Sequence, residues 1–153
     1  MKRIDIREVI GIVANVGVLI GILFLAIELR QNNEFARAEA RNYLTQSIYT
    51  LLEMQRDPRW IAAKQRADSG EDLTYEDTIM LSSVNSAVFR HFENAFFQSR
   101  YGVYSEGEFA AETQQLRLAL QERLYAQYWD EAQSSHSVEF QNFVNGIIQQ
   151  MAD

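Results

Sequence analysis

The chain has 153 residues, 47% hydrophobic and 23% charged, with a single proline, a length that accommodates roughly one domain of ~100–150 residues and a tail. It contains no cysteine, which excludes a disulfide scaffold, a thiolate zinc site, an iron–sulfur cluster and a cysteine nucleophile. The net charge of −7 argues against nucleic acid as a partner, because binding phosphates requires a surface rich in Lys and Arg.

The first predicted element is a transmembrane helix. Residues 9–29 are apolar except for Asn15 and Glu28, and the stretch reaches the ~20 residues that a helix needs to cross a bilayer core. We therefore interpret residues 1–30 as a transmembrane anchor in contact with the lipid bilayer and residues 31–153 as a separate helical domain.

Two other interpretations of this stretch are a buried core helix and a secretory signal peptide. A helix that is apolar on every face is difficult to bury in a globule of this size. A signal peptide has an apolar region of about 7–15 residues and a small-x-small cleavage site, whereas this stretch runs on into Glu28 and Arg30. Asp5 and Glu8 have the spacing of a capping box and place the helix start near Ile6. We expect an uncleaved, single-pass anchor in an inner membrane.

The basic residues near the span leave the orientation open. Three lie before it and three after it, namely Lys2, Arg3 and Arg7 against Arg30, Arg37 and Arg41. Lys and Arg are retained on the cytoplasmic side, and the first three are packed into a shorter stretch. This favours a cytoplasmic N-terminus and a periplasmic domain.

Within the predicted span, small residues recur on one helical face. Gly17 and Gly21 form a GxxxG pair, and Ala14 lies on the same face. Such residues let two backbones approach closely in lipid, where hydrophobicity no longer drives helices together. Asn15 is polar, and an unpaired amide is costly in a bilayer. We therefore predict an oligomer interface at Ala14, Asn15, Gly17 and Gly21, although glycine is also simply common in membrane helices.

The remaining chain is predicted to be all-α and acidic. The first thirty residues carry four basic and three acidic side chains, so the whole-chain charge of −7 leaves −8 for residues 31–153. No proline or glycine interrupts the pattern before Gln55, so the membrane helix is expected to continue into the domain. Asp57-Pro58 predicts the start of a second, short helix that ends at Gly70.

Further start and stop signals predict the later helices. Thr74 with Asp77 forms a capping box ahead of a long apolar face that ends at Gly102, and the acidic stretch from Ser105 to Glu108 starts the next helix. That helix has a possible break near Gln121, and the last helix begins at Ser137. Helices joined by short loops usually pack antiparallel, so we expect an antiparallel helical bundle.

Two segments carry distinctive patterns: FLAIELRQNN at residues 24–33 and FENAFFQSRYG at residues 92–102. They resemble the YLAxQIRQN junction and the WENxYYQxRxG helix end of a widespread uncharacterised family of small bacterial single-span membrane proteins. Glu28 stands where glutamine is usual in that family, and Phe92 where tryptophan is usual. The resemblance implies a bacterial inner-membrane protein with an N-terminal span followed by a helical domain, and the family supplies no known activity that could be assigned to this chain.

The sequence lacks the common catalytic and metal-binding patterns. His91 and His136 are the only histidines, and the residues three positions before them are Val88 and Gln133, whereas a di-iron bundle needs glutamate there. A zincin motif, a P-loop and a Rossmann glycine pattern are also missing. We therefore predict no metal, no cofactor and no enzymatic activity.

One polar and aromatic stretch allows two interpretations. Glu93, Asn94, Gln98 and Arg100 lie among aromatic residues of the same predicted helix and are candidates for a small-molecule pocket. The alternative is that these groups satisfy one another and loop backbone inside the bundle, as buried polar groups normally do.

The leading functional hypothesis is a non-enzymatic membrane protein that mediates assembly. Its partners are then further copies of itself or the other subunits of a larger membrane complex. The alternative is a membrane-tethered small-molecule sensor.

Overall fold

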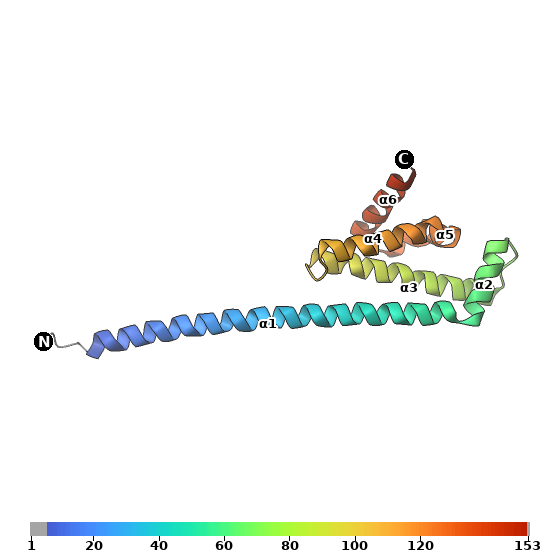
Figure 1. Ribbon diagram of the computed structural model, residues 1–153. Coiled ribbons are helices and arrows are strands. Elements are labelled where there is room, and N and C mark those ends of the chain that lie inside the picture. Colours follow the sequence, from blue (N-terminus) through green and yellow to red (C-terminus); the bar gives the residue numbers. More distant parts are fainter. Residues whose placement is uncertain (1–5, 153) are drawn as a thin grey trace. The chain divides into compact units, whose positions relative to one another are not determined.

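The computed structural model describes residues 6–152, and this part of the chain is almost entirely helical, without strands (Figure 1). Its elements are α1 (Ile6–Arg56), α2 (Pro58–Ser69), α3 (Tyr75–Arg100), α4 (Glu106–Gln121), α5 (Arg123–Ala132), the 3₁₀ helix η1 (Gln133–Ser135) and α6 (Val138–Ala152). The predicted all-α fold is confirmed, and so is the continuation of the N-terminal helix to the end of α1. The predicted capping box of Asp5 and Glu8 lies outside what the structure describes.

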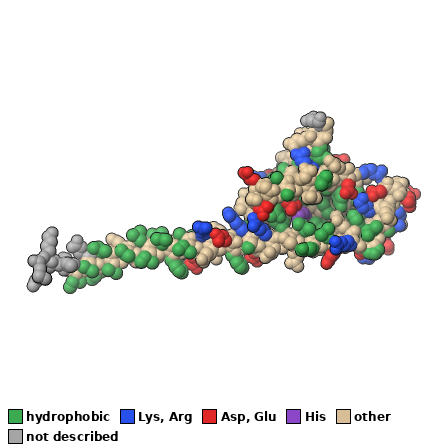
Figure 2. All heavy atoms as spheres, in the orientation of Figure 1, with side chains coloured by type: hydrophobic (Ala, Val, Ile, Leu, Met, Phe, Trp, Pro, Cys, Tyr) green, Lys and Arg blue, Asp and Glu red, His purple; other side chains and the backbone are tan. Residues whose placement is uncertain are grey.

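The chain divides into two compact units, Met1–Glu39 and Ala40–Asp153, and the boundary falls inside α1. Within its described residues, the first unit consists of the N-terminal part of that helix alone. A single helix has no second element against which to bury its side chains, and its large apolar residues are accordingly exposed. Figure 2 shows hydrophobic side chains along the visible face of this part of α1.

Local signals set the ends of α2. The Asp57 side chain accepts the backbone N–H of Arg59 at 2.8 Å, and Pro58 occupies the first helical position, where its missing N–H costs nothing. The helix ends at Gly70, whose φ of 73° lies in the left-handed region that glycine adopts without strain.

The next two helices start where they were predicted to start, and each begins with a capping box. In α3 the Thr74 side chain accepts the backbone N–H of Asp77, and the Asp77 side chain accepts that of Thr74. Ser105 and Glu108 repeat this exchange at the start of α4. The predicted break near Gln121 is also confirmed, because α4 ends there and α5 begins at Arg123.

The second unit is held together by a largely aromatic core. Trp129, Phe89 and Phe140 are fully buried, with ring centroids 5.1 Å apart for Phe89 and Trp129 and 5.7 Å apart for Trp129 and Phe140. The other buried members of the same cluster are Trp60, Ala63, Leu81, Val84, Val88, Leu116, Leu120, Tyr125, Val144 and Ile147. The core therefore draws residues from every helix from α2 to α6.

Consecutive helices of this unit pack against one another. α2 contacts α3, α3 contacts α4, and α4 contacts α5, and Figure 1 shows α3 and α4 side by side and antiparallel. α5 also reaches back to α2 and α3, while α6 packs against α4. The return of α5 brings the end of α2, the start of α3 and the face of α5 together around one hollow.

Candidate functional site

The residues of the predicted oligomer interface lie on α1 in the first unit. Ala14, Asn15, Gly17 and Gly21 are all exposed. A Cβ atom added at Gly17 or at Gly21 would have no neighbour within 4 Å, so packing within the described chain does not require glycine at either position. The Asn15 side chain has no hydrogen-bond partner among the described residues.

The Glu93 carboxylate joins α3 to the start of α6. Its Oε1 accepts the backbone N–H of Ser137 at 2.8 Å, and its Oε2 accepts bonds from His136 Nδ1 at 2.9 Å and from the Arg90 guanidinium at 2.8 Å. The same guanidinium donates to the backbone carbonyl of Ser135 at 2.9 Å. A buried acidic group is thus fully hydrogen-bonded, which is what makes its burial tolerable.

These hydrogen bonds also determine the ionisation of Glu93. Burial by itself raises the pKa of the carboxyl, since it disfavours the charged form. The hydrogen bonds from the Ser137 backbone, His136 and Arg90 outweigh that effect and lower the pKa of Glu93 from 4.5 to about 2. Glu93 is therefore a carboxylate at every pH well above 2.

His136 is enclosed by aromatic rings. Its ring centroid lies 5.4 Å from that of Trp129, 5.6 Å from that of Phe140 and 6.2 Å from that of Phe89. Its side chain is wholly covered, and that of Glu93 is 10% exposed. The arrangement orients the η1–α6 junction through the hydrogen bonds from His136 and the Ser137 backbone to Glu93.

The other three residues of the predicted ligand pocket make weaker contacts. Asn94 Oδ1 and Gln98 Nε2 are 3.5 Å apart, at the outer limit of a hydrogen bond. The Arg100 guanidinium lies 5.7 Å from the centroid of the Phe96 ring, within the range of a cation–π contact. Glu93 bonds to loop backbone, as the structural interpretation of this stretch expects. A ligand role for these residues stays a prediction.

A second buried acidic cluster connects α2 to α3. The Arg66 guanidinium donates to both carboxylate oxygens of Asp77, at 2.6 and 3.0 Å, and Thr74 donates to Asp77 through its hydroxyl at 2.8 Å and its backbone N–H at 3.0 Å. The bonds from Arg66 and then those from Thr74 lower the pKa of Asp77 from 3.8 to about 2. This cluster fixes the loop between the two helices.

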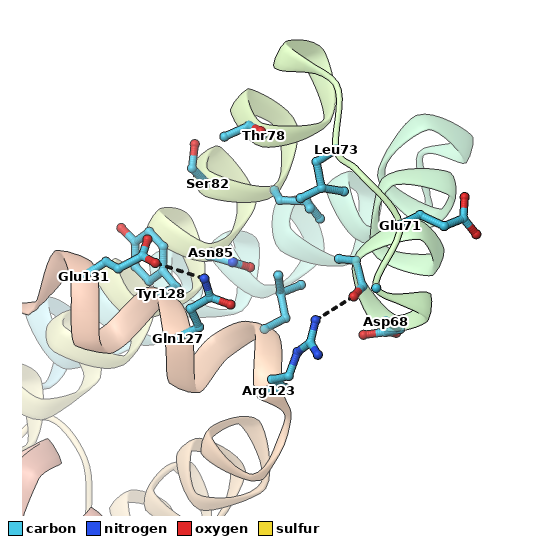
Figure 3. Close-up of a pocket in the computed structure, with 14 residues that line it drawn as sticks. Asp68, Glu71, Leu73, Thr78, Ser82, Asn85, Arg123, Gln127, Tyr128 and Glu131 are labelled. Atoms are coloured by element: carbon cyan, nitrogen blue, oxygen red, sulfur yellow. Dashed lines mark hydrogen bonds between the residues drawn. The ribbon is translucent and has the colours of Figure 1, made fainter.

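Sequence reasoning missed a hollow where α2, α3 and α5 meet. In Figure 3 the hollow is surrounded by Asp68 at the end of α2, Glu71 of the α2–α3 connection, Thr78 and Ser82 of α3, and Arg123 of α5. The cavity measures about 300 Å³, at the lower end of the range for small-molecule sites.

The residue that could have revealed this hollow is Asn85. It lies four residues after Leu81 and four before Phe89, so it occupies a position on the apolar stripe of α3. All three residues are buried. A lone amide on such a stripe is a detectable sequence signal, but periodicity does not tell whether it meets a partner or a cavity.

The described part of the chain brings no metal site together. Among the described residues, no group of three or more His, Asp or Glu side chains could hold a metal ion. The Nε2 of the second buried histidine, His91, lies 3.5 Å from an oxygen of Glu112, which is a pairwise contact between α3 and α4.

No family model, curated protein or solved structure matches this chain.

Proposed function

We propose that this chain is a single-pass inner-membrane protein without catalytic activity, whose residues 9–29 cross the bilayer and whose helical domain mediates assembly. Its assembly partners are other copies of the chain or the subunits of a larger membrane complex. The observation that carries the proposal is the exposure of the apolar part of α1. This helix is long and apolar enough to cross a membrane by length and composition, and none of its most apolar window is buried.

That exposure favours a membrane helix over a core helix. Leu19, Leu23 and Phe24 are each more than three-fifths exposed, whereas the core helix of a soluble protein covers such residues. Soluble proteins rarely expose contiguous apolar patches larger than a few hundred Å². A lipid bilayer covers a helix of this length on all sides at once.

Self-association is supported by the small residues on α1. Gly17 and Gly21 leave space where a second backbone fits, and Asn15 gains a hydrogen-bond partner only if another group reaches it in the membrane. Beyond the apolar stretch the same helix exposes Phe35, and in the second unit it exposes Tyr43. Two copies of α1 could therefore contact each other both within the membrane and just beyond it, and both sets of contacts would favour the same oligomer.

The test is the mass of the intact protein in mild detergent over a hundredfold range of concentration. We expect an oligomer that dissociates on dilution, and the double variant Gly17→Ile/Gly21→Ile should dissociate at a concentration at least about tenfold higher, because the added side chains prevent close approach. Ala26→Ile is the matched control, since at 100° per residue it enlarges a small residue on the opposite face.

Two outcomes contradict self-association. The first is a monomer mass at all concentrations, and the second is an equal effect of the control and the double variant. The accessory-subunit form of the proposal then takes first place, and mass spectrometry of a native pull-down identifies the complex.

A further inference from the structure

The lining of the hollow between α2, α3 and α5 includes Asn85, a buried polar residue whose side-chain oxygen lacks a hydrogen-bond partner among the described residues. Asn85 is only 2% exposed, and its Oδ1 is buried with no hydrogen-bond partner within the described chain. A buried polar group without a partner costs about 1–3 kcal/mol. Most buried polar groups in native proteins are hydrogen-bonded, so an exception of this kind calls for an explanation.

Asn85 lies at the back of the hollow in the view of Figure 3, with Glu131 on one side and Asp68 and Glu71 on the other. The carbonyl of Asn85 is an acceptor, and the three carboxylates are acceptors as well. A ligand that satisfies this set must donate hydrogen bonds.

The charges around the hollow favour a cation. Asp68, Glu71 and Glu131 contribute three negative charges, and Arg123 contributes the one positive charge among the lining residues. Arg123 is already engaged, since its guanidinium donates to the backbone carbonyl of Ala67 at 2.8 Å. Asp68 is also paired, with Lys64 Nζ 2.9 Å from its Oδ2, so the excess negative charge comes from Glu71 and Glu131. The lining is thus electronegative, and it attracts cationic ligands.

The carboxylates are too dispersed for a metal ion. No group of three acidic or histidine side chains in the described chain could hold one. An organic cation of several carbons can instead reach acceptors at separate points. Leu73, Leu81 and Leu124 line the same hollow, and methylene groups pack favourably against such side chains.

We propose that this hollow binds an aliphatic diamine, with one ammonium group donating to Asn85 Oδ1, the second donating to the carboxylates of the rim, and the methylene chain lying against the leucines. The site is separate from the apolar part of α1, because all its residues belong to the second unit.

Thermal unfolding of the full-length protein in detergent tests the proposal with 1,4-diaminobutane as the probe. A ligand that binds only the folded state raises the Tm in a saturable way, by roughly 5 °C or more at about 100 times its Kd. We expect 1-aminobutane to give a smaller rise, and 1,4-butanediol or sodium chloride at equal ionic strength to give none. No rise with the diamine, or an equal rise with the diol, overturns the proposal.

The variant Asn85→Leu separates a ligand-binding role of Asn85 from a purely structural one, because the two roles predict different Tm values with and without the diamine. It removes the unpaired amide, so the Tm of the free protein should rise, while the diamine should no longer raise it further. If the diamine shift persists in this variant, the amine binds elsewhere and the proposal is wrong.

A second variant at the rim keeps the test valid if Asn85→Leu does not fold. Glu131 is exposed and accepts a bond from Gln127 at 3.0 Å, which Glu131→Gln can retain. This variant should keep the Tm of the free protein and weaken diamine binding about threefold or more. Glu53→Gln is the matched control, because Glu53 is exposed and does not line the hollow. Equal affinity in the two variants contradicts the proposal.

Discussion

The Glu93 carboxylate of α3 accepts the backbone N–H of Ser137 at 2.8 Å, across 44 positions of the chain. Ser137 directly precedes α6, and the first N–H groups of a helix have no partner within the helix itself. A carboxylate there also interacts favourably with the positive end of the helix dipole. Glu93 thus caps the last helix from another element of the bundle.

Replacing Glu93 with alanine should destabilise the second unit. The Ser137 N–H, His136 and Arg90 would each lose a partner, and we expect a loss of about 1–3 kcal/mol in the free energy of unfolding. Urea unfolding followed by circular dichroism measures it. Glu93→Gln should recover part of the loss, because the amide retains an acceptor for the Ser137 N–H.

The control for this prediction is Glu53→Ala, which removes an exposed carboxylate of α1 and should change the unfolding free energy by less than about 0.5 kcal/mol. A different outcome for Glu93→Ala would favour the interpretation of Glu93 and its neighbours in α3 as a ligand pocket. In that case Glu93→Ala leaves the Tm unchanged but removes a molecule that co-purifies with the wild-type protein.

The second unit should lose stability in acid. The pKa of Glu93 falls from 4.5 to about 2 on folding, and that of Asp77 from 3.8 to about 2. Both pKa values are lower in the folded state. At a pH between the folded and the unfolded pKa of each group, the unfolded chain therefore binds more protons than the folded chain. The stabilisation is therefore complete above pH 4.5 and is lost as the pH falls through 2.

Urea midpoints measured from pH 7 to pH 2 test this dependence. The urea midpoint of the wild-type protein should fall most steeply below pH 4.5. The difference in midpoint between the wild type and Glu93→Gln should shrink over the same interval, since glutamine does not titrate. If the difference in urea midpoint between the two proteins stays constant from pH 5 to pH 2, ionisation of Glu93 does not contribute to stability.

The N-terminal stretch should remain attached to the mature protein and hold it in the membrane. Alkaline carbonate removes peripheral proteins but not transmembrane helices, so the full-length chain should stay in the membrane pellet after this wash. Intact-mass analysis should find residues 9–29 present. A mature chain that begins near Arg30, or full-length protein in the soluble fraction, contradicts the anchor.

The side of the membrane on which the domain lies is open to a direct measurement. The chain has no cysteine, so a single introduced cysteine reports one position. In Ser134→Cys, at an exposed site in η1, a membrane-impermeant maleimide should label intact spheroplasts, whereas Lys2→Cys should be labelled only after lysis. The reverse pattern places the domain in the cytoplasm.

Helix boundaries could be read from the sequence because they depend on neighbouring residues. Asp57-Pro58 and Gly70 enclose α2, and the Thr74 and Ser105 capping boxes start α3 and α4. Each of these signals acts within about four residues, so periodicity and capping rules were sufficient. The same is true of the apolar stretch in α1, whose composition alone predicts a membrane helix.

The partners of the buried polar groups depend on how the helices pack. Nothing local to Glu93 indicates that it contacts His136 and Ser137, which lie 43 and 44 positions later in the chain. Asn85 stands out on an apolar face, but only the return of α5 against α2 and α3 creates the hollow beside it. The sequence by itself determined the helices and the exposed apolar stretch, because those follow from short-range hydrogen bonding and hydrophobicity. The tertiary structure decided which polar groups meet and which remain unpaired, because side chains distant in sequence are brought together only by packing.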